Sequence, residues 1–203
     1  MTLLDNVVDY LRQIEALEAT GLVTGVLCVW LLVRQNVWTW PLGLAYALVS
    51  LVVFYQARLY ADLGMHAYYV VMNAYGWWYW TRGSRSAAET SLPVVNAPRP
   101  VVWALLAIFA VATVAIAVTL DRFTDAALPY WDTAANVASF LAMWMTARKY
   151  IENWYVWFVV DVALTAIYLY KDIEFYAVLY CIYLGMAVAG WWAWRRTMQL
   201  RPA

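Results

Sequence analysis

The 203-residue sequence has few charged side chains: thirteen basic and thirteen acidic residues make up 13% of the chain. Soluble globular domains carry about 25% charged residues, and 66% of this chain is hydrophobic. The composition therefore excludes an ordinary soluble domain. The formal net charge is zero. Because nucleic-acid-binding domains are usually basic, we expect no nucleic-acid partner.

Residues that build catalytic and metal sites are also scarce. There is one histidine, His66, and the two cysteines, Cys28 and Cys181, lie inside apolar stretches, so we expect neither a disulfide bond nor a metal site. The sequence has no glycine-rich phosphate loop, no HExxH motif and no nucleophile elbow. We therefore expect a protein that is not an enzyme and has no cofactor. The only lysines, Lys149 and Lys171, lie at the ends of apolar stretches, which excludes a retinal-binding photoreceptor because its Schiff base needs a lysine in mid-helix.

What the sequence does have is a series of long apolar stretches. A helix that crosses a bilayer needs about 20 residues. We expect seven such helices, at about 17–33, 38–56, 62–80, 100–120, 131–147, 153–170 and 174–194. The predicted fold class is an all-α membrane protein in which the whole chain, 1–203, forms a single transmembrane domain.

A repeat with an offset of 114 residues runs through the chain without a gap. Arg34 matches Arg148, Trp40 matches Trp154, and the string Gly-Trp-Trp-x-Trp-x-Arg that begins at Gly76 recurs in the same register. Internal repeats of this size in a hydrophobic chain are typical of secondary transporters, which hold the substrate between the two halves.

The repeat divides the chain into residues 17–82 and 131–196, with a linker rich in proline, glycine and serine at 83–99 and an unpaired helix at 100–120. A three-helix unit ends on the opposite side of the membrane from its start, so one extra helix must return the chain. We therefore expect two parallel three-helix repeats joined by an inverting fourth helix (3+1+3). An outer N-terminus places most of the thirteen basic residues inside, so the positive-inside rule predicts an outer N-terminus and a cytoplasmic C-terminus.

One face of the sixth stretch combines two indoles with a carboxylate. Trp154, Trp157 and Asp161 stand at i, i+3 and i+7, which places them on one side of a helix. A carboxylate within a membrane span is costly and normally faces a cavity or a partner. The set suits a flat aromatic cation, because the rings stack on it and the acid offsets its lost hydration. A contact of Asp161 with a neighbouring helix is the alternative. Asn136 on the fifth stretch joins the same cavity or bonds between helices.

A second polar face lies on the third stretch, where His66, Tyr69 and Asn73 have the same spacing. Asn73 offers both a donor and an acceptor, which suits a carboxamide or a sugar hydroxyl. On the seventh stretch, Tyr180 and Tyr183 hold the repeat positions of His66 and Tyr69. We expect these residues to converge with the face of the sixth stretch on one substrate pocket. A packing role is the alternative for His66.

Both halves of the sequence resemble the PnuC-type vitamin transporters. The first half carries Leu-Tyr-Ala-Asp at 59–62 and Tyr-Gly-Trp-Trp-Tyr-Trp at 75–80. The second half carries Trp-Asp at 131–132 and the string Arg-Lys-x-x-Glu-Asn-Trp-x-x-Trp that begins at Arg148. The likeness runs over about 18–195, apart from the linker and the fourth helix. It implies a homotrimeric facilitator of the bacterial inner membrane, whose vitamin cargo a cytoplasmic kinase then traps by phosphorylation.

The resemblance also implies a binding region and a cargo. The family's Trp-x-x-Trp face with its following Asn or Asp corresponds here to Trp154, Trp157 and Asp161, while His66 stands where several members carry a glutamine. Members pass nicotinamide riboside, thiamine or riboflavin. The first two carry a permanent positive charge on an aromatic ring, so Asp161 favours a cation, and the frequency of cargoes in the family favours nicotinamide riboside. Thiamine, then riboflavin, remain alternatives.

Other classes of protein remain open. A sugar or amino-acid facilitator with parallel three-helix repeats is the alternative to a vitamin carrier, whereas a purely structural subunit would not require Asp161 or Asn73. We expect passive transport. Proton-coupled carriers use intramembrane acids or histidines in relays, and this chain offers one of each at unrelated depths in the repeat.

Overall fold

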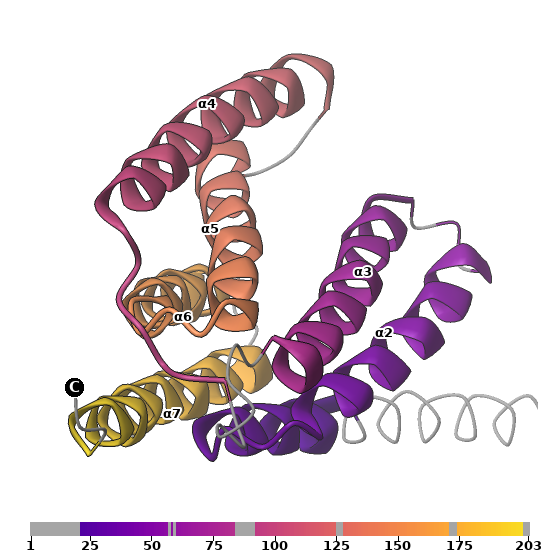
Figure 1. The fold of residues 1–203 in the computed structure, drawn as a ribbon. Coiled ribbons are helices and arrows are strands. Elements are labelled where there is room, and N and C mark those ends of the chain that lie inside the picture. Colours follow the sequence, from indigo (N-terminus) through magenta and orange to yellow (C-terminus); the bar gives the residue numbers. More distant parts are fainter. Residues whose placement is uncertain are drawn as a thin grey trace, which may run out of the picture.

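The computed structural model describes residues 21–56, 58, 60–83, 92–124, 128–170 and 174–200, with the side chains of these residues except at 60–62 and 174–175. In this part of the chain the regular structure is helical, apart from one parallel β-bridge between Val95 and Tyr150. The helices are a first helix described over Gly21–Val33, α2 (Thr39–Gln56), α3 (Tyr60–Arg82), α4 (Arg99–Phe123), α5 (Pro129–Ala147), α6 (Asn153–Tyr170) and α7 (Glu174–Gln199). The predicted all-helical fold is confirmed, and each predicted apolar stretch corresponds to one helix (Figure 1).

The helices pack in pairs within two halves of the molecule. The first half consists of the first helix, α2 and α3, and the second half consists of α5, α6 and α7. Helix α2 packs against α3, and α6 packs against α7, while α3 contacts α5 between the halves. Helix α4 packs across α5 at one edge of the molecule (Figure 1).

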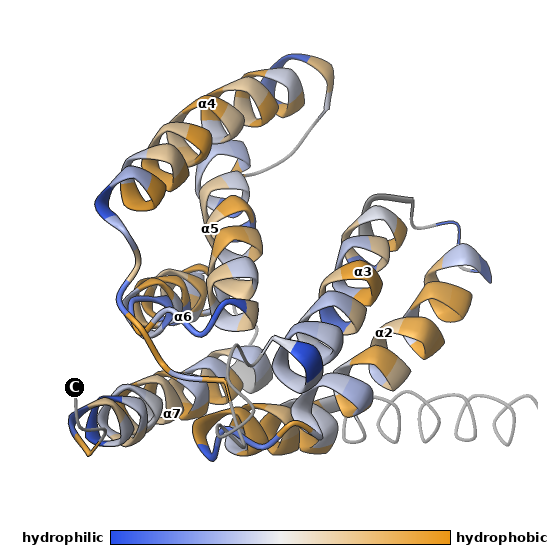
Figure 2. Cartoon of the chain, viewed as in Figure 1, coloured by the Kyte–Doolittle hydropathy of each residue, from blue (hydrophilic) through white to orange (hydrophobic). Residues whose placement is uncertain are grey.

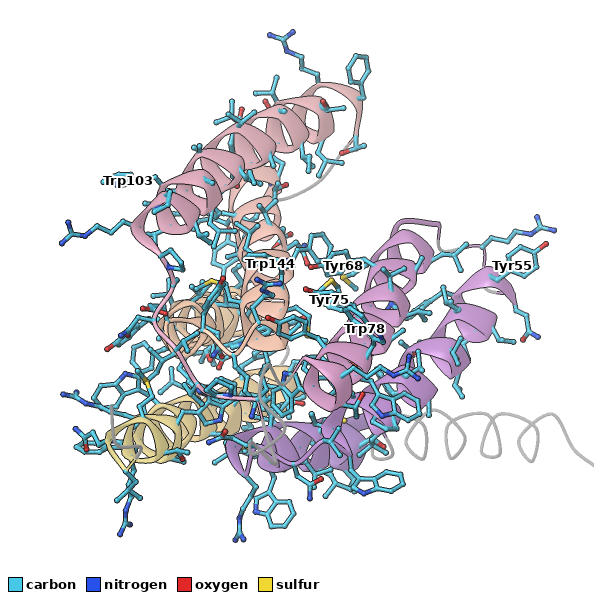
Figure 3. All side chains as sticks on the ribbon, viewed as in Figure 1. Tyr55, Tyr68, Tyr75, Trp78, Trp103 and Trp144 are labelled. Carbon is cyan, nitrogen blue, oxygen red and sulfur yellow. The ribbon has the colours of Figure 1, made fainter. Side chains whose placement is uncertain are left out.

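Within the described residues, α2, α4, α6 and α7 are long and apolar enough to cross a membrane. Figure 2 shows α4 as the most uniformly hydrophobic of them. Its Trp103 and Val111 side chains are 69% and 70% exposed, and Figure 3 shows Trp103 projecting from the helix away from its neighbours. Such a surface is unfavourable in water and favourable in lipid. Helices α3 and α5 carry several polar side chains and are less apolar than α4.

The turn after the first helix and the turn after α5 have the same backbone structure. Gln35 and Lys149 are 114 residues apart, and both are left-handed, with φ of 54° and 55°. In each turn the next residue, Asn36 or Tyr150, donates its N–H to the carbonyl five residues back, at 2.9 and 3.0 Å. This is a Schellman cap, in which the left-handed residue is usually glycine. A residue with a Cβ costs about 1–2 kcal/mol there, so the two side chains are kept at a cost.

The Gln35 and Lys149 side chains meet where the two halves contact each other. Lys149 Nζ donates to Gln35 Oε1 at 3.1 Å and to the Leu92 carbonyl at 2.9 Å. It also lies 4.3 Å from the centre of the Trp80 ring. Lys149 is only 2% exposed, and burial of an ammonium group is costly unless such contacts compensate it. These side chains therefore tie the two capped turns together.

The described end of the predicted linker, residues 92–98, packs on the turn between α5 and α6. The Val95 N–H donates to the Lys149 carbonyl at 3.1 Å, and the Ile151 N–H donates to the Val95 carbonyl at 3.0 Å. The Ala97 N–H donates to a carboxylate oxygen of Glu152 at 2.9 Å. Proline and glycine content indicated a connecting segment, but its backbone groups are bonded to the second half.

Four tryptophans form the centre of the core. Trp40 meets Trp80 edge-on with 5.3 Å between ring centres, and Trp154 meets Trp194 in the same way at 5.4 Å. Trp80 and Trp194 contact each other across the halves at 6.1 Å. Trp80 donates its indole N–H to the last turn of α5, and Trp194 donates to the last turn of the first helix, both at 3.1 Å. Each half thus caps a helix of the other.

Two glycines allow this packing. A Cβ at Gly76 of α3 would overlap the Trp40 ring, and a Cβ at Gly190 of α7 would overlap the Trp154 ring. Both glycines hold the same repeat position. The close approach of the second and third helices in each half therefore depends on a missing side chain.

Candidate functional site

A cavity of about 300 Å³ lies between the two halves, and the first helix, α2, α3, α5, α6 and α7 all contribute to its lining. Of the nine residues predicted for a substrate pocket, seven line this cavity: Tyr69, Asn73, Trp154, Trp157, Asp161, Tyr180 and Tyr183. They come from α3, α6 and α7. The structure brings them together, and their role in substrate binding stays a prediction.

The other two predicted residues, His66 and Asn136, are not among the residues that line the cavity. His66 is buried, with its ring centre 4.7 Å from Phe54 and 5.8 Å from Tyr69. Asn136 is exposed and donates to the Asp132 carbonyl one turn back in its own helix, at 2.9 Å. Helical spacing identifies the face of a helix but not where the cavity ends along it. Both residues lie one turn away from residues that do line it.

On α6, Trp157 is fixed by a polar contact with α5. Its indole N–H donates to Thr146 Oγ1 at 3.1 Å, and the Thr146 hydroxyl lies 3.2 Å from Asn153 Oδ1. Asn153 is fully buried at the start of α6 and donates to the Tyr150 carbonyl at 2.6 Å. The ring is therefore held in a set orientation against the cavity, as a stacking surface needs to be.

Asp161 lies one helical turn beyond Trp157 on the same face of α6. It is 4% exposed, and among the described lining residues it is the only one with a formal charge. A buried carboxylate is costly unless a cation or hydrogen-bond donors offset the loss of water. Next to the Trp157 ring, this arrangement can bind a flat cation by stacking and charge attraction.

The α2–α3 wall presents a neutral amide. Asn73 Nδ2 donates to the Tyr69 carbonyl at 2.8 Å, which directs Oδ1 towards α2. There a Cβ added at Gly43 would overlap Asn73 Oδ1. Gly43 holds the repeat position of Trp157. Where the second half has an indole, the first half thus has an amide oxygen that remains able to accept a hydrogen bond.

Tyrosines form the α7 wall. Tyr180 packs edge-on against Tyr183 with 5.7 Å between ring centres and stacks on Tyr168 of α6 at 5.3 Å and 14°. A Cβ at Gly25 of the first helix would overlap the Tyr183 hydroxyl. The Tyr183 phenol group therefore reaches across the cavity to the first half. The phenol groups offer both donors and acceptors.

A polar contact outside the cavity joins α3 to α5. Figure 3 shows Tyr68, Tyr75 and Trp144 in the space between these helices. Tyr68 donates its hydroxyl to the Phe140 carbonyl at 2.6 Å, and Arg148 donates to the Tyr75 hydroxyl at 3.3 Å. These contacts hold the two halves together beside the cavity.

Several lining residues were missed by the sequence analysis. The clearest is Trp40, which lines the cavity as Trp154 does. The repeat could have identified it, because Trp40 and Trp154 hold the same position. Thr146 and Tyr46 also line it, but threonines and tyrosines on many helices give no comparable signal.

Comparison with known proteins gives consistent results. The family model for the nicotinamide mononucleotide transporter matches residues 15–196. The chain is 24% identical over 201 residues to the nicotinamide riboside transporter PnuC of Escherichia coli, covering 88% of this chain and 84% of that protein. It is 29% identical over 179 residues to the riboflavin/roseoflavin transporter RibM of Streptomyces davaonensis, covering 86% and 84%. Among solved structures, the vitamin B3 transporter PnuC matches with a TM-score of 0.72 and 23% identity, covering 97% of this chain and 87% of the other.

Proposed function

The chain belongs to the nicotinamide mononucleotide transporter family, and we propose that it carries nicotinamide riboside across the bacterial inner membrane by facilitated diffusion. Membership makes it a multi-pass membrane protein of a transporter family, in keeping with its apolar helices. The named relatives carry nicotinamide riboside in one case and riboflavin or roseoflavin in another. The choice of cargo must therefore come from the site.

The observation that carries the proposal is Asp161. This buried carboxylate lines the cavity, and the ring of Trp157, one turn earlier on the same helix, lines it as well. Nicotinamide riboside has a positively charged pyridinium ring, which the carboxylate would neutralise while the indole stacks on it. Its carboxamide and sugar hydroxyls would find partners in Asn73 and in the tyrosines of α7.

Cavity size supports a small cargo. Ligand pockets usually measure about 300–1,000 Å³, so a cavity of about 300 Å³ suits a vitamin with a single six-membered ring better than the three fused rings of riboflavin. Riboflavin is nevertheless the second candidate, because RibM shares 29% identity with this chain. Thiamine, a cation with two rings, is the third.

Uptake by proteoliposomes tests the choice directly. Purified protein reconstituted in liposomes should take up labelled nicotinamide riboside, and an excess of unlabelled nicotinamide riboside should compete more strongly than thiamine or riboflavin. Liposomes without protein provide the control. Uptake of riboflavin alone would replace the first candidate by the second.

We propose that transport is passive. A proton-coupled carrier needs a relay of titratable groups, and His66, the chain's one histidine, is packed among aromatic rings outside the cavity lining. Uptake should therefore be driven by the solute gradient alone and should be insensitive to a protonophore. Accumulation against a gradient that the protonophore abolishes would refute this.

We also propose that the chain forms two parallel three-helix repeats, 17–82 and 131–196, joined by the linker 83–99 and an inverting helix at 100–120, with an outer N-terminus and a cytoplasmic C-terminus. The matched caps at Gln35 and Lys149 support the repeat, and the basic residues support the orientation. Membrane-impermeant maleimide should label Arg58→Cys from outside and Arg34→Cys only after lysis, in a background without native cysteines. The reverse pattern would invert the topology.

Further features are implied by the family resemblance. We propose that the protein is a homotrimer, that a cytoplasmic kinase traps the cargo by phosphorylation, and that the transporter itself catalyses no reaction. Light scattering of the purified protein in detergent measures the mass of the oligomer. Deleting the kinase gene should reduce accumulation in cells without changing uptake by proteoliposomes.

A further inference from the structure

Two indole N–H groups at the cavity have no acceptor among the described residues. They belong to Trp40 and Trp154, and both side chains are 2% exposed. A buried donor without an acceptor is costly, and few polar groups in native proteins are left in that state. The other two core tryptophans, Trp80 and Trp194, both donate to carbonyls. Among the described residues, the buried indole N–H groups without an acceptor thus belong to the two rings that line the cavity.

The two rings differ in how they face the neighbouring glycine. The Trp40 edge against Gly76 consists of Cε3, Cζ3 and Cη2, on the side of the ring opposite the N–H. The Trp154 edge against Gly190 consists of Cη2, Cζ2 and Cε2, beside the N–H. The N–H edge of Trp40 is therefore turned away from Gly76, whereas that of Trp154 lies near Gly190.

An acceptor lies on the same wall of the cavity as the Trp40 indole. Asn73 Oδ1 lies against Gly43, one turn along α2 from Trp40, and its Nδ2 is already bonded to Tyr69. The wall therefore offers one donor and one acceptor, from Trp40 and Asn73. A hydroxyl group both donates and accepts a hydrogen bond, so it complements this pair better than a carbonyl or a methyl group does.

We infer that Trp40 is a substrate-binding residue whose indole N–H donates to a sugar hydroxyl of the cargo, with Asn73 Oδ1 accepting from the same hydroxyl. The inference rests on the proposed function, which supplies a nucleoside with its cation at Asp161. Because Asp161 and Trp157 belong to the second half, the uncharged sugar lies towards α2 and α3 of the first half. The charged ring and the sugar are thus recognised by different halves.

The test removes the N–H while keeping the shape of the ring. Suppression of a stop codon at position 40 with 3-benzothienylalanine replaces the indole N–H by sulfur. The binding of nicotinamide riboside and of its 2′-, 3′- and 5′-deoxy forms is then measured for both proteins. The replacement should weaken binding of the parent about three- to tenfold, as expected for one hydrogen bond. The replacement should not change the binding of the deoxy form that lacks the hydroxyl bonded to Trp40. A double-mutant cycle then records this as coupling between the indole N–H and that hydroxyl.

A matched control uses the same replacement at Trp38, which is 67% exposed and is not among the lining residues; binding should not change. A second measurement needs no variant: the indole N–H resonance of Trp40 should shift when the parent binds and not when the coupled deoxy form binds.

Equal losses for the parent and for all three deoxy forms, with an unmoved resonance, would make Trp40 a packing residue and overturn the inference. Failure of the proposed function would give a different result: the wild-type protein would not bind nicotinamide riboside at all.

Discussion

The second helix of each half faces the cavity at four matching positions, and one of the four holds the same residue in both halves. Gly43 and Ala47 stand in the first half where Trp157 and Asp161 stand in the second. The shared position holds a tryptophan that packs on a glycine of the next helix. The position that packs on a glycine of the next helix thus matches between the halves, while the other cavity-lining positions have diverged.

The two capped turns also combine a matching backbone with different side chains. Their backbones match in φ and in hydrogen bonding, yet one carries Gln35 and the other Lys149. If both turns carried glutamine, two amides would meet between the halves. If both carried lysine, two ammonium groups would meet there and repel each other. The unlike pair makes a hydrogen bond of 3.1 Å. The matched turns thus carry unlike side chains at their contact, whereas the matched Trp80 and Trp194 rings meet across the halves as identical residues.

The largest effect is expected when a shared packing position is broken. Gly190→Ala should destabilise the fold by about 1–3 kcal/mol, because the added Cβ overlaps the rigid Trp154 ring. Gly185→Ala on the same helix meets no atom of the described structure within 4 Å, and it should stabilise the helix by about 0.5–1 kcal/mol. Thermal melting in detergent compares the two. Equal melting temperatures would contradict the close approach.

Removing a diverged position should affect binding more than folding. Trp157→Ala should weaken the binding of nicotinamide riboside by about thirtyfold, because a stacking surface for a desolvated cation is worth about 2 kcal/mol. Titration calorimetry measures the loss. Trp38→Ala, which removes an exposed indole outside the cavity lining, is the control and should bind as the wild type does. A loss of the same size in both variants would refute the role of Trp157.

Making the two turns alike should weaken the joint between the halves. Gln35→Lys removes the acceptor for Lys149 Nζ and places a like charge beside it, so stability should fall by about 1–2 kcal/mol. Gln35→Glu keeps an acceptor and adds an opposite charge, so its melting temperature should equal or exceed that of the wild type. A lower melting temperature for Gln35→Glu than for Gln35→Lys would contradict this account.

The smallest effects are expected at His66 and Asn136. Neither is among the cavity-lining residues. Asn136→Ala and His66→Gln should therefore change the affinity for nicotinamide riboside by less than about twofold, which is about 0.4 kcal/mol of binding free energy. Uptake and binding assays of the purified variants check this. A tenfold loss in either variant would return that residue to the site.

The sequence predicted much of the fold, because apolar length and the 114-residue register are both legible without coordinates. It also predicted which polar and aromatic residues of α3, α6 and α7 come together, because polar groups within a membrane span are few and normally face a cavity or a partner. It placed His66 and Asn136 in the pocket because spacing marks a face and not a depth. It missed Trp40 because an indole near a membrane interface has an ordinary explanation.

Other features could not be read from the sequence for physical reasons. Residues 92–98 look like linker by composition, but their backbone groups bond to the turn between α5 and α6, a long-range pairing that local propensity does not encode. The burial of Lys149 depends on Gln35 and Leu92, which are distant in sequence. Such contacts arise only when the halves are assembled.

The central claim is that Asp161 selects a positively charged ring, and one pair of ligands isolates it. Nicotinamide riboside and its dihydro form have nearly the same shape, but only the first carries a charge on the ring. Titration calorimetry should show that the wild type binds the cation about ten- to a hundredfold more tightly than the neutral form. In Asp161→Asn this preference should fall below about threefold. Equal binding of both ligands by the wild type, or an undiminished preference in Asp161→Asn, would contradict the account.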